Sequence, residues 1–144
     1  MTDNGKNVII LGVIGADCHA VGNRILDEFF TEQGFRVINT GVMTSQDEFV
    51  QAAQENQASA IMVSTLYGHG EIDCSGLREK CTNAGLNDIV LYIGGNLTVG
   101  SHSFEDIEKT YLEMGFDRAF SAEADLDKCA DLLRKDIAGR SRKT

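Results

Sequence analysis

The chain has 144 residues, a length typical of one domain, and a formal net charge of −9. This acidic balance argues against nucleic-acid binding, which needs a basic face. No apolar run approaches the ~20 residues that span a bilayer, and the polar first six residues lack a signal-peptide pattern, so we expect a cytoplasmic protein. The four cysteines, which form no C-x-x-C pair and are expected to be reduced, are Cys18, Cys74, Cys81 and Cys129.

Apolar runs and amphipathic segments alternate five times along the chain. Strands are predicted at residues 8–14, 35–41, 59–64, 89–93 and 118–120. Helices are predicted at residues 20–33, 46–56, 74–84, 104–114 and 125–137. The predicted N-caps are Ser45, Asp73 and Ser103, and the glycines predicted to end helices are Gly34, Gly85 and Gly115. We expect the basic residues near the C-terminus, Arg140, Arg142 and Lys143, to form a frayed tail.

This alternation predicts an α/β fold, a doubly wound parallel sheet of five strands with helices on both faces. The strands are continuous apolar runs, as a sheet buried on both faces requires. We expect the flavodoxin/Rossmann-like strand order 2-1-3-4-5, whose switch point lies between the first and third strands. The whole chain, 1–144, is expected to be a single domain with its core at about 6–137.

The loop after the first predicted strand carries an acid, an imidazole and a glycine. Asp17 and His19 are two residues apart in a tight turn, where the carboxylate can accept the second ring N–H and orient the imidazole as a metal ligand. Gly22 leaves the backbone open to a bulky group. This loop lies at the carboxyl edge of the predicted sheet, where ligands bind. The alternative is a turn with a capping aspartate and a surface histidine.

Two more loops of small or polar residues reach the same edge, and together the three favour a large ligand. One carries the hydroxyls of Ser64 and Thr65, and the other spans residues 94–100. The sequence lacks the glycine motifs of a dinucleotide site and of a P-loop, which argues against both. A receiver-type phosphoacceptor site would need an aspartate where Ser64 stands. An FMN site would need a first loop rich in serine and threonine, which this chain does not have. A neutral histidine backed by a carboxylate suits a metal that brings its own equatorial ligands, such as a corrinoid cobalt.

The motifs Asp17-x-His19-x-x-Gly22, Ser64-x-Leu66 and Gly94-Gly95 resemble the pattern of cobalamin-binding domains. Longer segments are similar to the small subunit of glutamate mutase (methylaspartate mutase), and they lie at residues 12–23, 66–74, 76–81, 94–100 and 114–118. The resemblance covers roughly residues 6–137. It departs after the fifth predicted strand, where residues 120–123 replace a loop that contains Pro-Gly in the family.

The resemblance implies that His19 is the lower axial ligand of cobalt and that Asp17 orients it, with cobalamin bound base-off and its nucleotide tail beside the sheet. No other catalytic residue is implied on this chain. The implied cofactor-binding residues are Ala16, Asp17, Cys18, His19, Ala20, Gly22, Ser64, Thr65, Leu66, Gly94, Gly95, Asn96, Leu97, Thr98, Val99 and Gly100. His69 either contacts cofactor or partner or lies in a loop, and His102 is expected at the surface.

The activity that the resemblance implies is the adenosylcobalamin-dependent interconversion of L-glutamate and threo-3-methyl-L-aspartate, begun by an adenosyl radical. A dicarboxylate substrate needs converging arginines, but those of this chain fall on helices or at strand starts: Arg24, Arg36, Arg78, Arg118 and Arg134. The resemblance therefore implies a large catalytic subunit that binds glutamate, in two copies of each chain, without which this chain is inactive. Three alternatives stay open: a corrinoid carrier of a methyltransferase system, which usually adds an N-terminal helical region; a non-enzymatic cobalamin-binding module; and a mutase acting on 2-methyleneglutarate.

Overall fold

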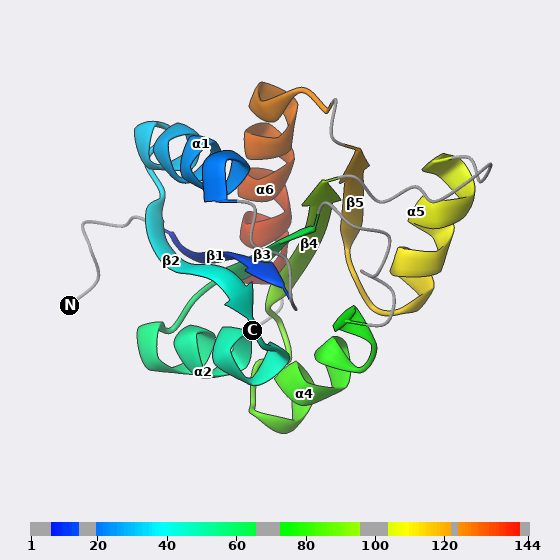
Figure 1. The fold of residues 1–144 in the computed structure, drawn as a ribbon. Helices are drawn as coiled ribbons and strands as arrows, with labels where there is room; N and C mark the ends of the chain where they lie inside the picture. Colours follow the sequence, from blue (N-terminus) through cyan, green and yellow to red (C-terminus); the bar gives the residue numbers. More distant parts are fainter. Residues whose placement is uncertain (1–6, 15–19, 66–72, 96–103, 122–123, 142–144) are drawn as a thin grey trace.

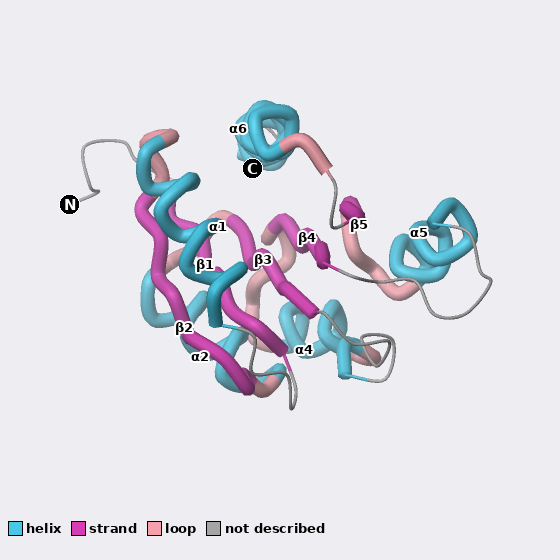
Figure 2. The backbone as a smooth tube through the Cα atoms, turned by 45° about the horizontal axis from the view of Figure 1, so that its top comes forward, coloured by secondary structure: helices cyan, strands magenta, loops and turns pink. Residues whose placement is uncertain are grey.

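The computed structural model describes residues 7–14, 20–65, 73–95, 104–121 and 124–141. These residues form a parallel sheet with the order β2-β1-β3-β4-β5 and helices on both faces (Figures 1 and 2), as predicted. The strands are β1 (Val8–Ile14), β2 (Arg36–Thr44), β3 (Ala60–Thr65), β4 (Val90–Gly95) and β5 (Arg118–Ser121). The helices are α1 (Ala20–Glu32), α2 (Gln46–Asn56), α4 (Leu77–Asn83), α5 (Phe104–Glu113) and α6 (Leu126–Ser141).

The sheet is buried on both faces at β1, β3 and β4, which explains why these strands are continuous apolar runs. The edge strand β2 is only partly buried and contains several polar residues, so the prediction of a continuous apolar run is wrong for it. Side chains of successive strand residues point to opposite faces. Accordingly, Ile9 and Leu11 of β1 pack in the cluster under α1 and α6, whereas Ile10 and Ile14 pack in the cluster under α2, α4 and α5. Figure 1 shows α1 and α6 on one side of the sheet and α2 and α4 on the other. The fold therefore has three layers with two separate apolar clusters.

Local signals in the sequence correctly predict several helix ends. Ser45 forms a capping box with Glu48, each side chain pairing with the other residue's backbone N–H. Gly34 follows α1 with φ +99°, and the N–H of Phe35 donates to the carbonyl of Phe30, which closes a Schellman motif. The same backbone bonds recur after α4 and α5, where the glycines have φ values of +86° and +107°.

Most boundaries lie within two residues of the prediction, and three differ by more, each because of a contact or a conformation outside the local pattern. Asp73 and Cys74 are themselves helical and do not cap α4, which begins after Gly76 at φ +86°. A residue in that left-handed conformation breaks a right-handed helix. The predicted N-cap at Ser103 lies outside the described residues.

The second strand continues to Thr44 instead of ending at Gly41. Two register shifts against β1 take up its extra residues, and Gly41 and Met43 adopt positive φ there. The last helix continues to Ser141 because Arg140 bonds to Asp117 beside the sheet. The expectation that Arg140 belongs to a frayed tail is therefore wrong.

Candidate functional site

The carboxyl ends of four strands lie side by side and bring together the predicted site residues at the ends of β3 and β4. Ser64 lies beside Val13 of β1 on one side and beside Gly94 of β4 on the other. Gly94 in turn pairs with Phe120 of β5. The strand order thus places β1 next to β3, the switch point at which α/β sheets bind ligands.

The two glycines that end β4 have different physical roles. A Cβ on Gly95, whose φ is +114°, would lie 1.9 Å from the carbonyl oxygen of Thr65, so the sheet itself requires glycine there. A Cβ on Gly94 would lie 3.6 Å from the carbonyl oxygen of Phe120, an ordinary contact. Only at Gly94 is the absent side chain free to serve a ligand, whereas Gly95 is explained by backbone packing.

A cavity of about 340 Å³ lies between the sheet and the two helices α1 and α6. Strand residues Leu11, Met62 and Tyr92 line it, as do Leu26 and Phe30 of α1. At the strand ends its lining includes Ser64, Gly94 and Ser121. An apolar interior with few polar groups at this edge of the sheet is the usual form of a small-molecule site.

Asn23 is the polar residue at this cavity that the sequence analysis did not single out. It lies in the first part of α1, lines the cavity and is only 5 % exposed. Its Nδ2 donates to Asn39 Oδ1 (2.7 Å), while its own Oδ1 is buried without a hydrogen-bond partner among the described residues. The signal that points to it is its spacing from Leu26 and Phe30, which puts an amide on the apolar face of the helix.

Tyr92 carries its ring at the cavity and its hydroxyl in an ion-pair network at the far end of the side chain. The hydroxyl donates to Asp136 Oδ2, which also accepts from Arg118 Nε (2.7 Å), and Arg118 Nη2 donates to Asp136 Oδ1 (3.2 Å). Burial raises the pKa of Tyr92 above its ordinary value, and the hydrogen bond to Asp136 adds to this effect. Tyr92 is therefore a neutral donor that holds α6 against β4, with no phenolate available for chemistry.

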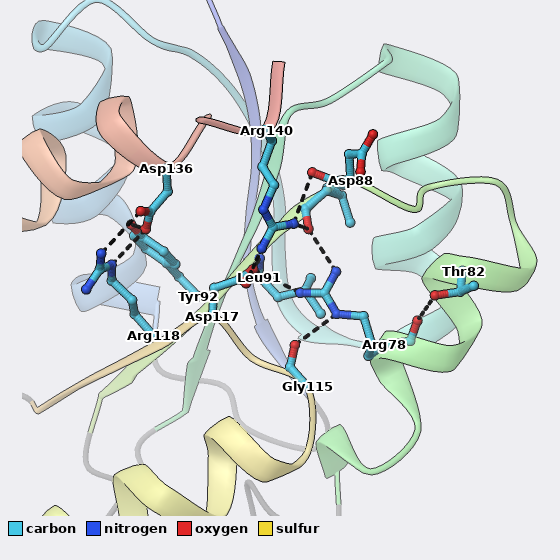
Figure 3. A network of polar contacts seen from close by, with 11 residues as sticks. Arg78, Thr82, Asp88, Leu91, Tyr92, Gly115, Asp117, Arg118, Asp136 and Arg140 are labelled. Atoms are coloured by element: carbon cyan, nitrogen blue, oxygen red, sulfur yellow. Dashed lines mark hydrogen bonds and ion pairs between the residues drawn. The ribbon is translucent and has the colours of Figure 1, made fainter. Parts of the chain in front are cut away.

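Other arginines are held near the amino ends of the strands, far along the sheet from Ser64 and Gly94. Figure 3 shows Arg78 and Arg140 on either side of Asp117, which precedes β5. Arg78 donates to Asp117 Oδ2 (2.9 Å) and to the carbonyls of Gly115 (2.9 Å) and Ile89 (2.8 Å). These two guanidinium groups are therefore held by contacts within the fold.

The structure describes only part of the predicted site. Its described members are Ala20 at the start of α1, Gly22, Ser64, Thr65, Gly94 and Gly95. The members outside the described residues are Ala16, Asp17, Cys18, His19, Leu66, Asn96, Leu97, Thr98, Val99 and Gly100, as are His69, His102 and the loop residues 122–123. Within the described part there is no cluster of three or more histidine, cysteine or acidic residues that could hold a metal.

The described cysteines are structural residues and not nucleophiles. Cys74, Cys81 and Cys129 are free and buried. Burial raises the pKa of Cys74 to about 12, and the charge of Asp73 adds to the shift. Burial likewise raises the pKa of Cys129 to about 11. Such thiols remain protonated and unreactive near neutral pH.

No helix in the described ranges is long and apolar enough to cross a membrane.

Comparison with solved structures shows a fold shared by proteins of different function. The chain superposes on a cobalamin-binding protein from Desulfitobacterium hafniense with a TM-score of 0.74 and 19 % identity, covering 92 % of this chain and 60 % of that one. It also matches the monomethylamine corrinoid protein of Methanosarcina barkeri (TM-score 0.66, 22 % identity, 90 % and 55 % of the two chains). The signal receiver domain of a NarL response regulator from Mycobacterium tuberculosis gives 0.67 at 11 % identity, covering 93 % of this chain and 98 % of that one. The fold alone therefore does not decide the function.

Sequence comparison is more specific. The family model described as the B12 binding domain matches residues 7–125. The glutamate mutase sigma subunit of Escherichia coli O157:H7 is 56 % identical over 135 residues, which cover 94 % of this chain and 91 % of that protein. The glutamate mutase sigma subunit of Clostridium cochlearium is 52 % identical over 132 residues, with 92 % and 96 % covered. This chain, with its cavity at the switch point, belongs to the B12-binding domain family and, within it, to the glutamate mutase sigma subunits.

Proposed function

We propose that this chain is the small subunit of an adenosylcobalamin-dependent glutamate mutase and that it holds the cofactor base-off with His19 on cobalt. The observation that carries the proposal is the cavity beside the sheet, which reaches Ser64 and Gly94 at the switch point. It occurs in a chain 56 % identical to a glutamate mutase sigma subunit. The fold alone would leave a corrinoid carrier or a binding module equally open.

The described residues fit part of a cobalamin. The cavity holds about 340 Å³, within the usual range for small-molecule sites, and its interior is mostly apolar. Such a space suits a flat heterocycle such as the nucleotide base of the cofactor. The hydroxyl-bearing residues Ser64 and Ser121 line the cavity and provide polar groups to orient it. The proposal therefore assigns the tail of the cofactor to this cavity.

His19 and Asp17 are proposed to act at the other end of the cofactor. They come between β1 and α1, in the loop that follows the strand next to Ser64. His19 would ligate cobalt through one ring nitrogen, while Asp17 would accept the N–H of the other and orient the ring. When bound, adenosylcobalamin supplies a cobalt–carbon bond that breaks homolytically to begin radical chemistry. The segments at residues 16–22, 64–66 and 94–100 would hold the corrin and keep water away from it.

Substrate binding is proposed to belong to a large subunit. Arg78 and Arg140 are bound to Asp117 and to backbone carbonyls, and Arg118 is bound to Asp136, so none of these three is free to clamp a dicarboxylate. A second chain would supply those cations and cover the exposed face of the corrin, in two copies of each subunit. We expect the assembly in the cytoplasm.

Electron paramagnetic resonance of cob(II)alamin tests the cobalt ligand directly. The chain is prepared with ¹⁵N-histidine and mixed with the cofactor, and we expect a nitrogen splitting that changes with the label. His19→Gly should abolish this change and most of the affinity, whereas His102→Gly, the matched control, should leave both intact. Asp17→Asn should weaken binding by about 10–100-fold because it removes only the orienting partner. A splitting that the label leaves unchanged would contradict the His19 assignment.

Turnover of L-glutamate tests the division of labour between the two subunits. The purified chain with adenosylcobalamin should produce no 3-methylaspartate, and activity should appear when a glutamate mutase large subunit is added. The chain with His19→Gly should fail to restore activity to the same preparation. Turnover by the gel-filtered chain alone would disprove the need for the partner.

A further inference from the structure

The observation that the proposed function leaves unused is the unpartnered oxygen of Asn23. Asn23 lines the cavity between the sheet and α1 and is 5 % exposed, and its Oδ1 has no hydrogen-bond partner in the part of the chain that the structure describes. A buried acceptor without a donor costs free energy, so such atoms in native proteins call for an explanation. The other buried unpartnered side-chain oxygen in the described part of the chain, Oε1 of Gln46, does not line this cavity.

The orientation of the Asn23 amide is determined by its neighbours. Asn39 Oδ1 accepts from the N–H of Gly41 (2.8 Å), and Asn39 Nδ2 donates to Asp27 Oδ2 (2.9 Å). Because the Gly41 N–H can only donate and the Asp27 carboxylate can only accept, the Asn39 amide has one possible orientation. The Asn39 oxygen therefore faces Asn23. Asn23 must donate to it through Nδ2, which leaves Asn23 Oδ1 unpaired.

The same network strengthens that oxygen as an acceptor. The amide hydrogen bonds run from Asn23 to Asn39 and then to the carboxylate of Asp27, which Thr31 Oγ1 also contacts (3.2 Å). Consecutive hydrogen bonds polarise one another. Because the Asn23 N–H donates toward the Asp27 carboxylate through Asn39, the Asn23 oxygen carries more negative charge. An anion such as phosphate would be repelled here, whereas a neutral hydroxyl or amide N–H would be bound.

We infer that Asn23 is an affinity-determining residue of the cofactor site, whose Oδ1 accepts a hydrogen bond from a hydroxyl or amide N–H of the bound cobalamin. This inference rests on the proposed function. Cobalamin offers this chemistry in two places, the amide side chains of the corrin ring and the ribose hydroxyl of the nucleotide tail. A Cβ on the adjacent Gly22 would meet no atom of the described residues within 4 Å, so this part of the structure leaves space next to Asn23 on the helix.

The test compares two ligands and two variants of the full chain by equilibrium dialysis. Cobalamin carries the corrin amides and the nucleotide tail, whereas cobinamide carries the amides without the nucleotide. Asn23→Leu keeps a side chain of similar size and removes the acceptor. We expect its Kd for cobalamin to rise about tenfold, which corresponds to one hydrogen bond of about 1.4 kcal/mol. Thr31→Val is the matched control, because it breaks the exposed end of the same network without touching the cavity, and its Kd should not change.

The ligand pair identifies the donor. A loss confined to cobalamin supports a contact with the nucleotide tail, and an equal loss with cobinamide supports a contact with a corrin amide. Unchanged affinity of Asn23→Leu for both ligands overturns the inference while the wild-type chain still binds cobalamin. If the wild-type chain binds neither ligand, the proposed function fails first and the inference with it.

A second readout separates binding from folding. Thermal unfolding of the ligand-free chain should show a Tm for Asn23→Leu close to that of wild type, because the hydrogen bond lost from Nδ2 to Asn39 is offset by the removal of a buried acceptor that has no donor. Asn23→Ala, which is smaller, provides a second variant with the same expected change in Kd. A Tm that falls in both variants, together with an equal loss of affinity in Thr31→Val, would identify Asn23 as a structural residue and overturn the inference.

Discussion

At the scale of single residues, Tyr92 at the cavity and its partner Asp136 serve the fold. Tyr92 contributes its ring to the cavity wall and its hydroxyl to Asp136. Burial acts to raise the pKa of Asp136, but the hydrogen bonds from Arg118 and Tyr92 outweigh it and lower the pKa below its ordinary value. The charged form of this carboxylate is therefore the form that stabilises the protein.

Asp136→Asn should lower the free energy of unfolding at pH 7 by about 2 kcal/mol, because it weakens hydrogen bonds to a charged group. Since the folded-state pKa lies below the unfolded value of about 3.9, the contribution is complete above that value and is lost as the pH falls through the folded-state pKa. Urea unfolding at pH 7, 5 and 3 should therefore show a shallower acid dependence in the variant. Asp131→Asn, which alters an exposed ion pair on the same helix, should change stability by less than about 0.5 kcal/mol. An unaltered pH profile in Asp136→Asn would contradict the assignment.

At the scale of elements, the strand ends of the sheet are shaped by close backbone contacts as much as by the site. Gly95 ends β4 beside Thr65, with its α-carbon turned so that any side chain would meet the neighbouring backbone. Thr65 is only 1 % exposed, so the two strand ends have little room to separate. The Gly94-Gly95 pair therefore combines a structural requirement at its second residue with free space at its first.

Gly95→Ala should destabilise the chain by more than about 2 kcal/mol, because it adds both a backbone clash and a strained φ. Thermal unfolding of the ligand-free chain measures the change. Gly139→Ala in α6 is the matched control. Its Cβ would meet no atom of the described residues within 4 Å, and it should stabilise the chain by about 0.5–1 kcal/mol. Equal Tm values for Gly95→Ala and wild type would show that β3 and β4 can separate at their ends.

At the scale of the whole molecule, one carboxylate joins four elements near the amino ends of the strands. Asp117 precedes β5 and accepts from Arg78 of α4, Arg140 of α6 and the backbone N–H of Leu91 in β4 (Figure 3). Its side chain is 21 % exposed. The helices on both faces of the sheet are thereby tied together at the edge opposite the cavity mouth. The candidate site and this network occupy different ends of the same strands.

Asp117→Ala should lower the free energy of unfolding by about 3 kcal/mol, because it leaves two guanidinium groups and a backbone N–H without their partner. Asp47→Ala, which breaks a surface pair with Lys80 whose aspartate is 83 % exposed, should cost less than about 0.5 kcal/mol. Urea unfolding measures both. We expect the Kd for cobalamin to be unchanged in Asp117→Ala, and a loss of affinity equal to that of His19→Gly would contradict the separation of the two ends.

Features that depend on neighbours along the chain could be predicted from the sequence. The apolar runs predict the strands, and Ser45 and Gly34 mark helix ends through bonds between residues close in sequence. The topology then brings Ser64 and Gly94 together, as expected. The start of α4 could not be predicted, because the positive φ of Gly76 interrupts a segment whose pattern remains helical.

The sequence by itself determined the fold class, the strand order and the family, because hydrophobic periodicity, capping and motif spacing are local properties. Only the tertiary structure decided the length of the last helix, which depends on Arg140 reaching Asp117, 23 residues away in the chain. It likewise decided which residues line the cavity. The unpaired oxygen of Asn23 results from hydrogen bonds that run through Asn39 to Asp27. This network forms only when β2 lies against α1. A side-chain oxygen without a hydrogen-bond donor can occur only in the folded protein, because water bonds to every polar group of the unfolded chain.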